Sequence, residues 1–222
     1  MYPFVKRFFD VLISLIVLII LVPLMLPIII LLSLTGEGYI FYQQRRIGYQ
    51  NRYFNIIKFA TMLKNSPNMG AGSITLRNDP RLMPMGRFLR ITKINELPQI
   101  LNVLKGDMSL VGPRPLVDKT FNAYPDSIRN NIYDSKPGIT GLGSVVFRDE
   151  EELISNSNLP PHEYYERYIA PYKGELEVWY NNNKSFWVDC TIIFLTGWVV
   201  LFPKSKLIFN IFQNLPQRNF AL

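Results

Sequence analysis

The sequence predicts a membrane-associated protein, in which a proline-bent helix at the N-terminus precedes one small, basic domain. Three observations lead to this class. Residues 11–36 contain no charged side chain, and Pro23 and Pro27 interrupt that run. The chain has 222 residues, enough for a membrane segment and one domain. It carries 24 Lys and Arg against 17 Asp and Glu, a net charge of +7.

The uncharged run is long enough to enter a bilayer. Its 26 residues would measure ~39 Å as a straight helix, against ~30 Å for a hydrocarbon core. It exceeds the apolar part of a signal peptide, and no small-residue cleavage site follows it. Each proline removes a backbone donor, so we expect a bend. Lys6 and Arg7 precede the run, and Arg45 and Arg46 follow it. Because basic flanks favour the cytoplasm, we expect a re-entrant helix rather than a single span.

The counts of histidine and cysteine exclude several kinds of site. The chain has one histidine, His162, and one cysteine, Cys190. A zinc site of nitrogen and sulfur ligands, an intrachain disulfide framework, and Ser-His or Cys-His catalysis are therefore not expected. Any metal would take oxygen ligands, which points to Mg²⁺, and a covalent mechanism would use a carboxylate.

Positive charge is concentrated in residues 45–114, which hold twelve basic and three acidic side chains. Next to a membrane segment, this suits phosphorylated ligands at the bilayer surface, or contact with lipid headgroups. No zinc-finger, RRM or basic-zipper pattern appears, so we do not expect a nucleic acid partner. The basic residues are Arg45, Arg46, Arg52, Lys58, Lys64, Arg77, Arg81, Arg87, Arg90, Lys93, Lys105 and Arg114.

The segment INELPQILNVLKGD predicts a helix with one buried face. Asn95 would cap it, Glu96 would take the first helical position, and Gly106 would end it. The start of a helix can bind phosphate, although Asn95 and Glu96 could equally serve only the helix itself. The apolar positions at helical spacing are Leu97, Ile100, Leu101 and Leu104.

Two further arginines have a suggestive context. Arg114 stands between Pro113 and Pro115, and such rigid flanks reduce the entropy lost when a guanidinium binds phosphate. Arg90 closely precedes the predicted helix.

Three stretches of the C-terminal half are expected to be structural. Residues 149–152 are an acidic run, read as a solvated surface segment. Residues 190–202 are apolar but short for a membrane span, so we expect a buried or surface-lying helix. Residues 202–212 would rest on anionic lipid or pack as an amphipathic helix.

Taken together, several segments resemble the bacterial sugar transferases, the small monotopic phosphoglycosyl transferases. They are KRFFD, the proline-broken helix, NDPRLMPMGRFLR, INELPQILNVLKGDMSLVGPRP and KPGITGL, in this order from Lys6 to about Phe202. The resemblance implies an α-rich α/β domain on the membrane surface, fed by a re-entrant helix. Residues 1–36 would form that helix, 37–202 the catalytic domain, and 203–222 a membrane-surface or packing tail. The location implied is the cytoplasmic face of the bacterial inner membrane.

The resemblance also implies an activity and a site. Members transfer a sugar-1-phosphate from a UDP-sugar to undecaprenyl phosphate, release UMP and require Mg²⁺. The catalytic and metal-binding pair before LPQ corresponds here to Asn95 and Glu96. The candidate phosphate-binding residues are Lys58, Arg90, Arg114 and Arg148.

Asn95 departs from the family pattern, which has aspartate there. An amide cannot act as a carboxylate nucleophile. Glu96 could be the nucleophile, or Asp79 or Asp107 could contribute. The chain could also be an impaired or engineered member that binds polyprenyl phosphate or scaffolds glycan assembly. The sugar and the glycan pathway stay open, as does a homodimer.

Overall fold

The computed structural model describes residues 2–35, 37–69 and 79–217, and most of these lie in helices. Short 3₁₀ segments are labelled η, except η4, which is a π-helical turn. The elements in order are α1 (Tyr2–Leu34), β1 (Phe41–Ile47), η1 (Tyr49–Asn51), β2 (Tyr53–Phe59), η2 (Ser66–Asn68), α2 (Gly86–Ile91), η3 (Ile94–Gln99), α3 (Ile100–Lys105), β3 (Ser109–Val111), α4 (Asp118–Phe121), α5 (Asp126–Arg129), β4 (Gly138–Thr140), α6 (Leu142–Val146), α7 (Glu150–Ser155), α8 (Pro161–Tyr164), η4 (Tyr165–Ile169), α9 (Ala170–Asn183), α10 (Phe186–Leu201) and α11 (Leu207–Ile211).

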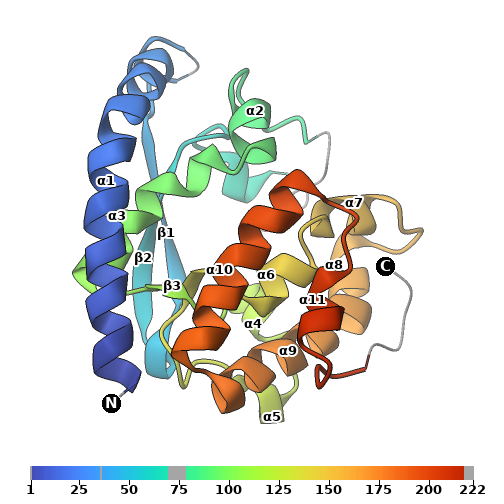
Figure 1. Ribbon diagram of the computed structural model, residues 1–222. Helices are drawn as coiled ribbons and strands as arrows, with labels where there is room; N and C mark the ends of the chain where they lie inside the picture. Colours follow the sequence, from blue (N-terminus) through green and yellow to red (C-terminus); the bar gives the residue numbers. More distant parts are fainter. Residues whose placement is uncertain (1, 36, 70–78, 218–222) are drawn as a thin grey trace.

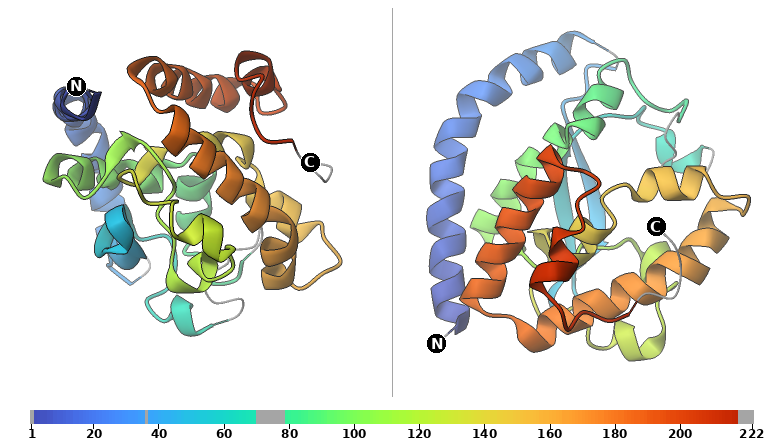
Figure 2. Two further views of the ribbon diagram at one scale, coloured as in Figure 1. Left: turned by 90° about the horizontal axis from the view of Figure 1, so that it is seen from below. Right: turned by 45° about the vertical axis from the view of Figure 1, so that its right-hand side comes forward.

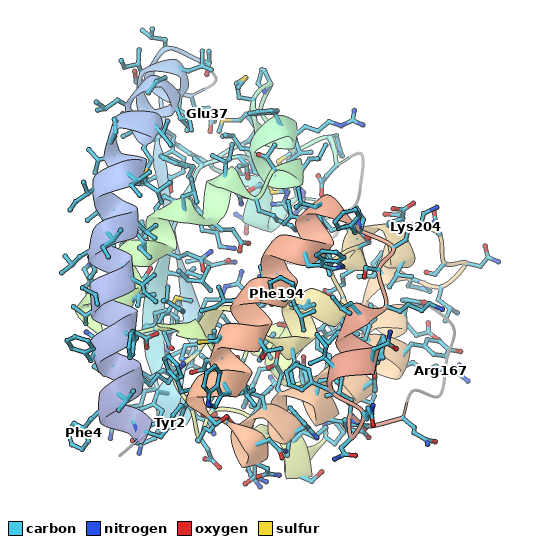
Figure 3. All side chains as sticks on the ribbon, in the orientation of Figure 1. Tyr2, Phe4, Glu37, Arg167, Phe194 and Lys204 are labelled. Atoms are coloured by element: carbon cyan, nitrogen blue, oxygen red, sulfur yellow. The ribbon has the colours of Figure 1, made fainter. Side chains whose placement is uncertain are left out.

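Helix α1 lies along one side of the molecule (Figure 1). It runs without a break through Pro23 and Pro27, and most of its apolar side chains are exposed. Phe4, 85% exposed, points away from the body in Figure 3. In the part of the chain that the structure describes, α1 alone is long and apolar enough to cross a membrane. The long exposed apolar surface indicates membrane association.

The charged residues at the start of α1 bind the body rather than solvent. Arg7 donates to the carbonyl oxygens of Val103 and Leu104 at 2.6 and 3.0 Å, at the end of α3. Asp10 is buried and accepts from the Ser109 hydroxyl at 2.8 Å and the Leu110 N–H at 3.1 Å. The segment KRFFD therefore anchors α1 to α3 and β3.

Within the described residues, the strands form two small sheets. Strands β1 and β2 form an antiparallel hairpin, with Phe41 opposite Phe59 and Ile47 opposite Tyr53. Strands β3 and β4 are parallel. Figure 2 shows the hairpin beside α1 and α3, and Lys6 of α1 forms an ion pair with Asp189 of α10 at 2.8 Å. The α-rich class with small sheets is confirmed.

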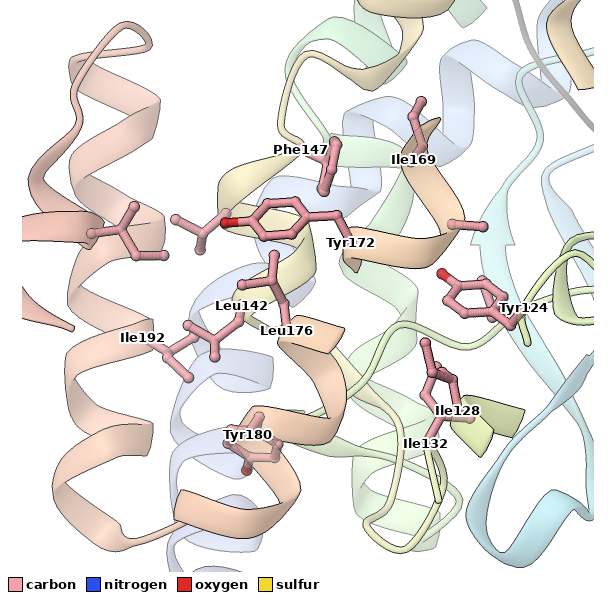
Figure 4. Close-up of a cluster of buried hydrophobic side chains, with 14 of the residues drawn as sticks. Tyr124, Ile128, Ile132, Leu142, Phe147, Ile169, Tyr172, Leu176, Tyr180 and Ile192 are labelled. Carbon is pink, nitrogen blue, oxygen red and sulfur yellow. The ribbon is translucent and has the colours of Figure 1, made fainter. Parts of the chain in front are cut away.

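The largest core lies between α5, α6, α9 and α10. Figure 4 shows Leu142, Leu176 and Ile192 lying together, and all three side chains are fully buried. Ile208 of α11 belongs to the same core, and Trp179 meets Phe212 with ring centroids 5.4 Å apart. The described part of the tail therefore packs on the body, and its contact with lipid stays a prediction.

The predicted helix start at Asn95 was wrong. Asn95 lies inside η3 and is buried, and α3 begins only at Ile100. The reason is local: Lys93 adopts a left-handed backbone with φ 60°, and Pro98 has no N–H to give an α-helical bond. The predicted end is confirmed, since Gly106 terminates α3 with φ 92°.

The apolar stretch near residue 190 forms a longer helix than expected. Helix α10 begins at Phe186, where the Ser185 side chain accepts from the Val188 N–H. Ile192, Leu195 and Val199 are buried, whereas Phe194 is exposed and projects outward in Figure 3. The helix is thus buried on one face and exposed on the other.

Candidate active site

A pocket of about 640 Å³ brings together residues that are far apart in the sequence. Its walls come from β1, β2, η3, the Arg114 turn, α7 and α9. Lys58, Arg90, Asn95, Glu96 and Arg114 all line it, so five of the six predicted site residues meet. Arg148 is not among the lining residues, and its role in phosphate binding stays a prediction.

Glu96 is held between two cations. Lys58 Nζ lies 2.9 Å from Glu96 Oε1, and the Arg114 guanidinium lies 2.8 Å from the same oxygen. A second Arg114 nitrogen reaches Glu96 Oε2 at 3.4 Å. The side chains of Lys58 and Glu96 are each 14% exposed, so solvent screens the contacts weakly.

Local structure explains why these three groups meet. Lys58 lies on β2, and Asn102 ties the following helix to that strand by accepting from the Ile57 N–H at 3.0 Å and donating to the Asn55 carbonyl at 2.8 Å. Arg114 is fixed from the other side, because the Tyr133 hydroxyl donates to its carbonyl oxygen at 2.8 Å. The pair of prolines around Arg114 limits the remaining freedom of that turn.

The electrostatics keep Glu96 ionised. Burial raises the pKa of Glu96, but Arg114 and Lys58 together hold that pKa well below its usual range. Burial lowers the pKa of Lys58 although Glu96 opposes the change, and Glu96 raises the pKa of Arg114. The pocket thus presents a carboxylate anion between cations, and such groups with shifted pKa values are common at functional sites.

Asn95 adds an unusual neutral group beside Glu96. Its Oδ1 is buried and has no hydrogen-bond partner among the described residues. Buried polar atoms are normally paired, so this oxygen is available to accept a contact from a ligand in the pocket.

The donor set suits Mg²⁺ but not a metal that needs a protein cage. No cluster of three or more His, Cys, Asp and Glu able to hold a metal occurs within residues 2–35, 37–69 and 79–217. Mg²⁺ needs no such cluster, because it keeps several waters and binds through one or two protein oxygens plus substrate phosphates. The Asn95 Oδ1 and the Glu96 carboxylate fit that pattern.

The alternative acids lie outside the pocket. Asp79 is buried in an ion pair with Arg81, 2.5 Å between Oδ2 and the guanidinium. Asp107 lines a separate, shallower hollow together with Lys105. Neither lines the pocket around Glu96.

The interpretation of the acidic run holds only in part: Asp149 and Glu152 are exposed, but Glu150 and Glu151 reach the pocket. Glu150 forms an ion pair with Lys173, whose side chain is 4% exposed. Glu151 binds Arg90 at 2.7 Å. Both glutamates line the pocket, so residues 149–152 are not simply a solvated segment. Periodicity gave no sign of this, because the contacts join α7 to α2 and α9.

Glu177 was not predicted from the sequence, and it lies behind the pocket at 1% exposure. Burial raises the pKa of Glu177 to about 7, while Lys173 and the backbone N–H groups of Arg114 and Gly143 oppose that rise. A Cβ at Gly143, in α6 directly after the segment KPGITGL, would lie 2.5 Å from Glu177 Oε1, so a side chain there would displace this carboxylate. The glycines on either side of Leu142 were the available signal in the sequence.

Comparisons with known proteins give a consistent result. The family model described as "Bacterial sugar transferase" matches residues 1–203. The undecaprenyl-phosphate galactose phosphotransferase of Salmonella typhimurium is 35% identical over 212 residues, which cover 89% of this chain and 40% of that protein. The UDP-N-acetylgalactosamine-undecaprenyl-phosphate N-acetylgalactosaminephosphotransferase of Aeromonas hydrophila is 35% identical over 199 residues, 88% of this chain and 43% of that protein.

A shorter relative is matched over most of its length. The exopolysaccharide production protein ExoY of Sinorhizobium fredii is 36% identical over 171 residues, which cover 71% of this chain and 75% of that protein. The chain thus spans about two fifths of the length of the first two relatives and three quarters of the third.

Proposed function

Because the chain belongs to the bacterial sugar transferase family, we propose that it transfers a sugar-1-phosphate from a UDP-sugar to undecaprenyl phosphate and releases UMP. The observation that carries the proposal is the Glu96 carboxylate, held ionised by Lys58 and Arg114 in a pocket rich in cations. The names of the relatives supply the acceptor, undecaprenyl phosphate, and a UDP-sugar as the donor.

In the proposed reaction, Glu96 is the nucleophile. The donor diphosphate competes with Glu96 for Lys58 and Arg114, which frees the carboxylate for attack. A Glu96 oxygen forms a bond to the phosphorus that carries the sugar, and the bond from that phosphorus to the UMP oxygen breaks. UMP leaves with the electron pair. An oxygen of the lipid phosphate then attacks the same phosphorus and releases Glu96.

Asn95 Oδ1 and Glu96 would hold Mg²⁺, which when bound neutralises diphosphate charge. Arg90 and Arg114 supply further positive charge at the pocket. Arg114 gives a planar fork that matches phosphate oxygens.

We also place the protein on the cytoplasmic face of the inner membrane, with α1 entering and leaving on one side. Two observations support this path. Figure 2 shows α1 following a curved course along the body. Both of its halves pack on that body, Asp10 through Ser109, and Met25 and Leu32 beside Phe59. A homodimer stays a prediction.

The covalent step can be tested on the intact protein. Incubation with UDP-sugar alone should add the mass of one sugar-1-phosphate to the parent. Glu96→Gln should lose this adduct and reduce UMP release by on the order of 10⁴-fold, since no nucleophile remains. Asn95→Asp should retain or raise activity, because it restores the carboxylate pair of the family. Asp107→Asn, which removes an acid outside the pocket, should keep the adduct.

Two outcomes would contradict the proposal in different ways. An adduct that persists in Glu96→Gln would show that another residue is the nucleophile. No adduct in the parent, with an adduct and turnover in Asn95→Asp, would identify an inactivated family member. A screen of UDP-sugars for UMP release would then name the donor.

A further inference from the structure

Lys93 has a left-handed backbone conformation, which is energetically unfavourable for a residue with a side chain. Its φ is 60°, in the left-handed region where Cβ crowds the following carbonyl oxygen. Its N–H donates to the Arg90 carbonyl at 3.1 Å, and its own carbonyl accepts from the Glu96 N–H at 3.0 Å. The turn thus joins the end of α2 to η3, two residues before Asn95. A left-handed residue other than glycine is uncommon, and of Gln50, Asn51 and Lys93 in the described part of the chain, only Lys93 lines the pocket.

The neighbouring cations of the pocket are already paired. Lys58 and Arg114 bind Glu96, and Arg90 binds Glu151. Lys93 also lines the pocket, yet within the described part of the chain its amine makes no ion pair or hydrogen bond. An incoming anion could therefore bind Lys93 without first displacing a carboxylate.

We propose that Lys93 binds the diphosphate of the UDP-sugar donor, an inference that rests on the proposed transferase function. The left-handed turn places Lys93 in the chain between Arg90 and the Asn95–Glu96 pair, and all four residues line the same pocket. An ammonium group carries three donors and a compact charge, which suits phosphate oxygens approaching from several directions. Lipid headgroups offer similar phosphate chemistry, but the position in the pocket favours the soluble donor.

Lys93→Gly removes the amine and keeps the left-handed turn of the backbone. Glycine adopts φ 60° without steric cost, so the melting temperature should stay the same or rise. Calorimetric titration should show UDP binding about tenfold weaker than in the parent, the usual loss for one charge-assisted contact. Uridine, which has no phosphate, should bind equally to both proteins. Lys93→Arg keeps the charge and should retain most of the UDP affinity.

Two matched variants serve as controls. Gln50→Gly relieves a left-handed residue, φ 53°, that lies outside the pocket. Lys105→Ala removes an exposed lysine charge that also lies outside it. Both should bind UDP like the parent.

The results also separate this inference from the proposed function. Parent-like UDP affinity in Lys93→Gly would overturn the role of Lys93 and leave the transferase proposal intact. A fall in uridine binding equal to the fall in UDP binding would likewise overturn that role. So would a variant that binds UDP like the parent but binds phosphatidylglycerol vesicles more weakly. A parent that neither binds UDP nor releases UMP would overturn the proposed function and, with it, the role of Lys93.

Discussion

At Glu177, burial and neighbouring charge act on one carboxylate in opposite directions. Burial penalises the anion, while Lys173 and two backbone N–H groups favour it, and the resulting pKa is raised from 4.5 to about 7. The folded protein therefore holds this proton more tightly than the unfolded chain. Below pH 4.5 Glu177 is protonated in both states and does not lower the free energy of unfolding. The folded state loses stability as the pH rises through 4.5–7.

The raised pKa of Glu177 predicts that the free energy of unfolding falls measurably as the pH rises. Across that window Glu177 should remove on the order of 3 kcal/mol from the free energy of unfolding, by the value of one pKa unit. Thermal unfolding of parent and Glu177→Gln, recorded from about pH 4 to about pH 8, should give curves whose difference grows in favour of the glutamine variant. The exposed Glu163 provides the control, since Glu163→Gln should follow the parent. A constant difference between parent and Glu177→Gln would contradict the assignment.

At the scale of elements, the position of α1 determines how the protein meets the membrane. Arg7 and Asp10 bind the body near one end of the helix, and Leu32 packs in a small core near the other. A straight crossing would carry one end ~30 Å away, across the hydrocarbon core, and break one set of these contacts.

The re-entrant path therefore predicts that the start of α1 and the chain after α1 are labelled from the same side. Phe4→Cys and Tyr49→Cys, each at an exposed position and each made in Cys190→Ala, should react with a membrane-impermeant maleimide only in inside-out vesicles. The Cys190→Ala background alone gives the unlabelled reference. Labelling of the two positions from opposite sides would favour a single span.

For the whole molecule, apolar surface and charge make different contributions to membrane binding. Several pocket cations are engaged internally, as in the Lys58–Glu96–Arg114 group, and so are not available to lipid headgroups. The exposed apolar surface of α1 is extensive. Burial of that surface in lipid does not depend on ionic strength, whereas headgroup contacts are screened within ~3 Å at 1 M salt.

We expect the protein to stay in the membrane pellet after washing with about 1 M NaCl and to be released by detergent. Immunoblots of pellet and supernatant provide the measurement. Release by salt alone would mean that charge, rather than α1, holds the protein on the membrane.

The sequence by itself determined the features that depend on residue type and local order. An uncharged run of 26 residues predicts a membrane-associated helix, and the order of motifs up to GPRP identifies the family. Gly106 ends its helix because glycine tolerates a positive φ. Arg114 was predicted as a site residue from its two flanking prolines, and Glu96 from the family resemblance; both line the pocket.

Only the tertiary structure decided which of these groups meet. Lys58 and Arg114 are 38 and 18 residues from Glu96, and their contacts depend on how β2 and the proline-flanked turn pack around η3. No motif in the sequence pointed to Glu150, Lys173 or Glu177. The fold pairs Lys173 with Glu150, and burial beside Lys173 shifts the pKa of Glu177. The start of α3 also shifted, since a left-handed Lys93 and Pro98 outweighed the capping preference of Asn95. Long-range packing and desolvation act between residues distant in the chain, so no local pattern encodes them.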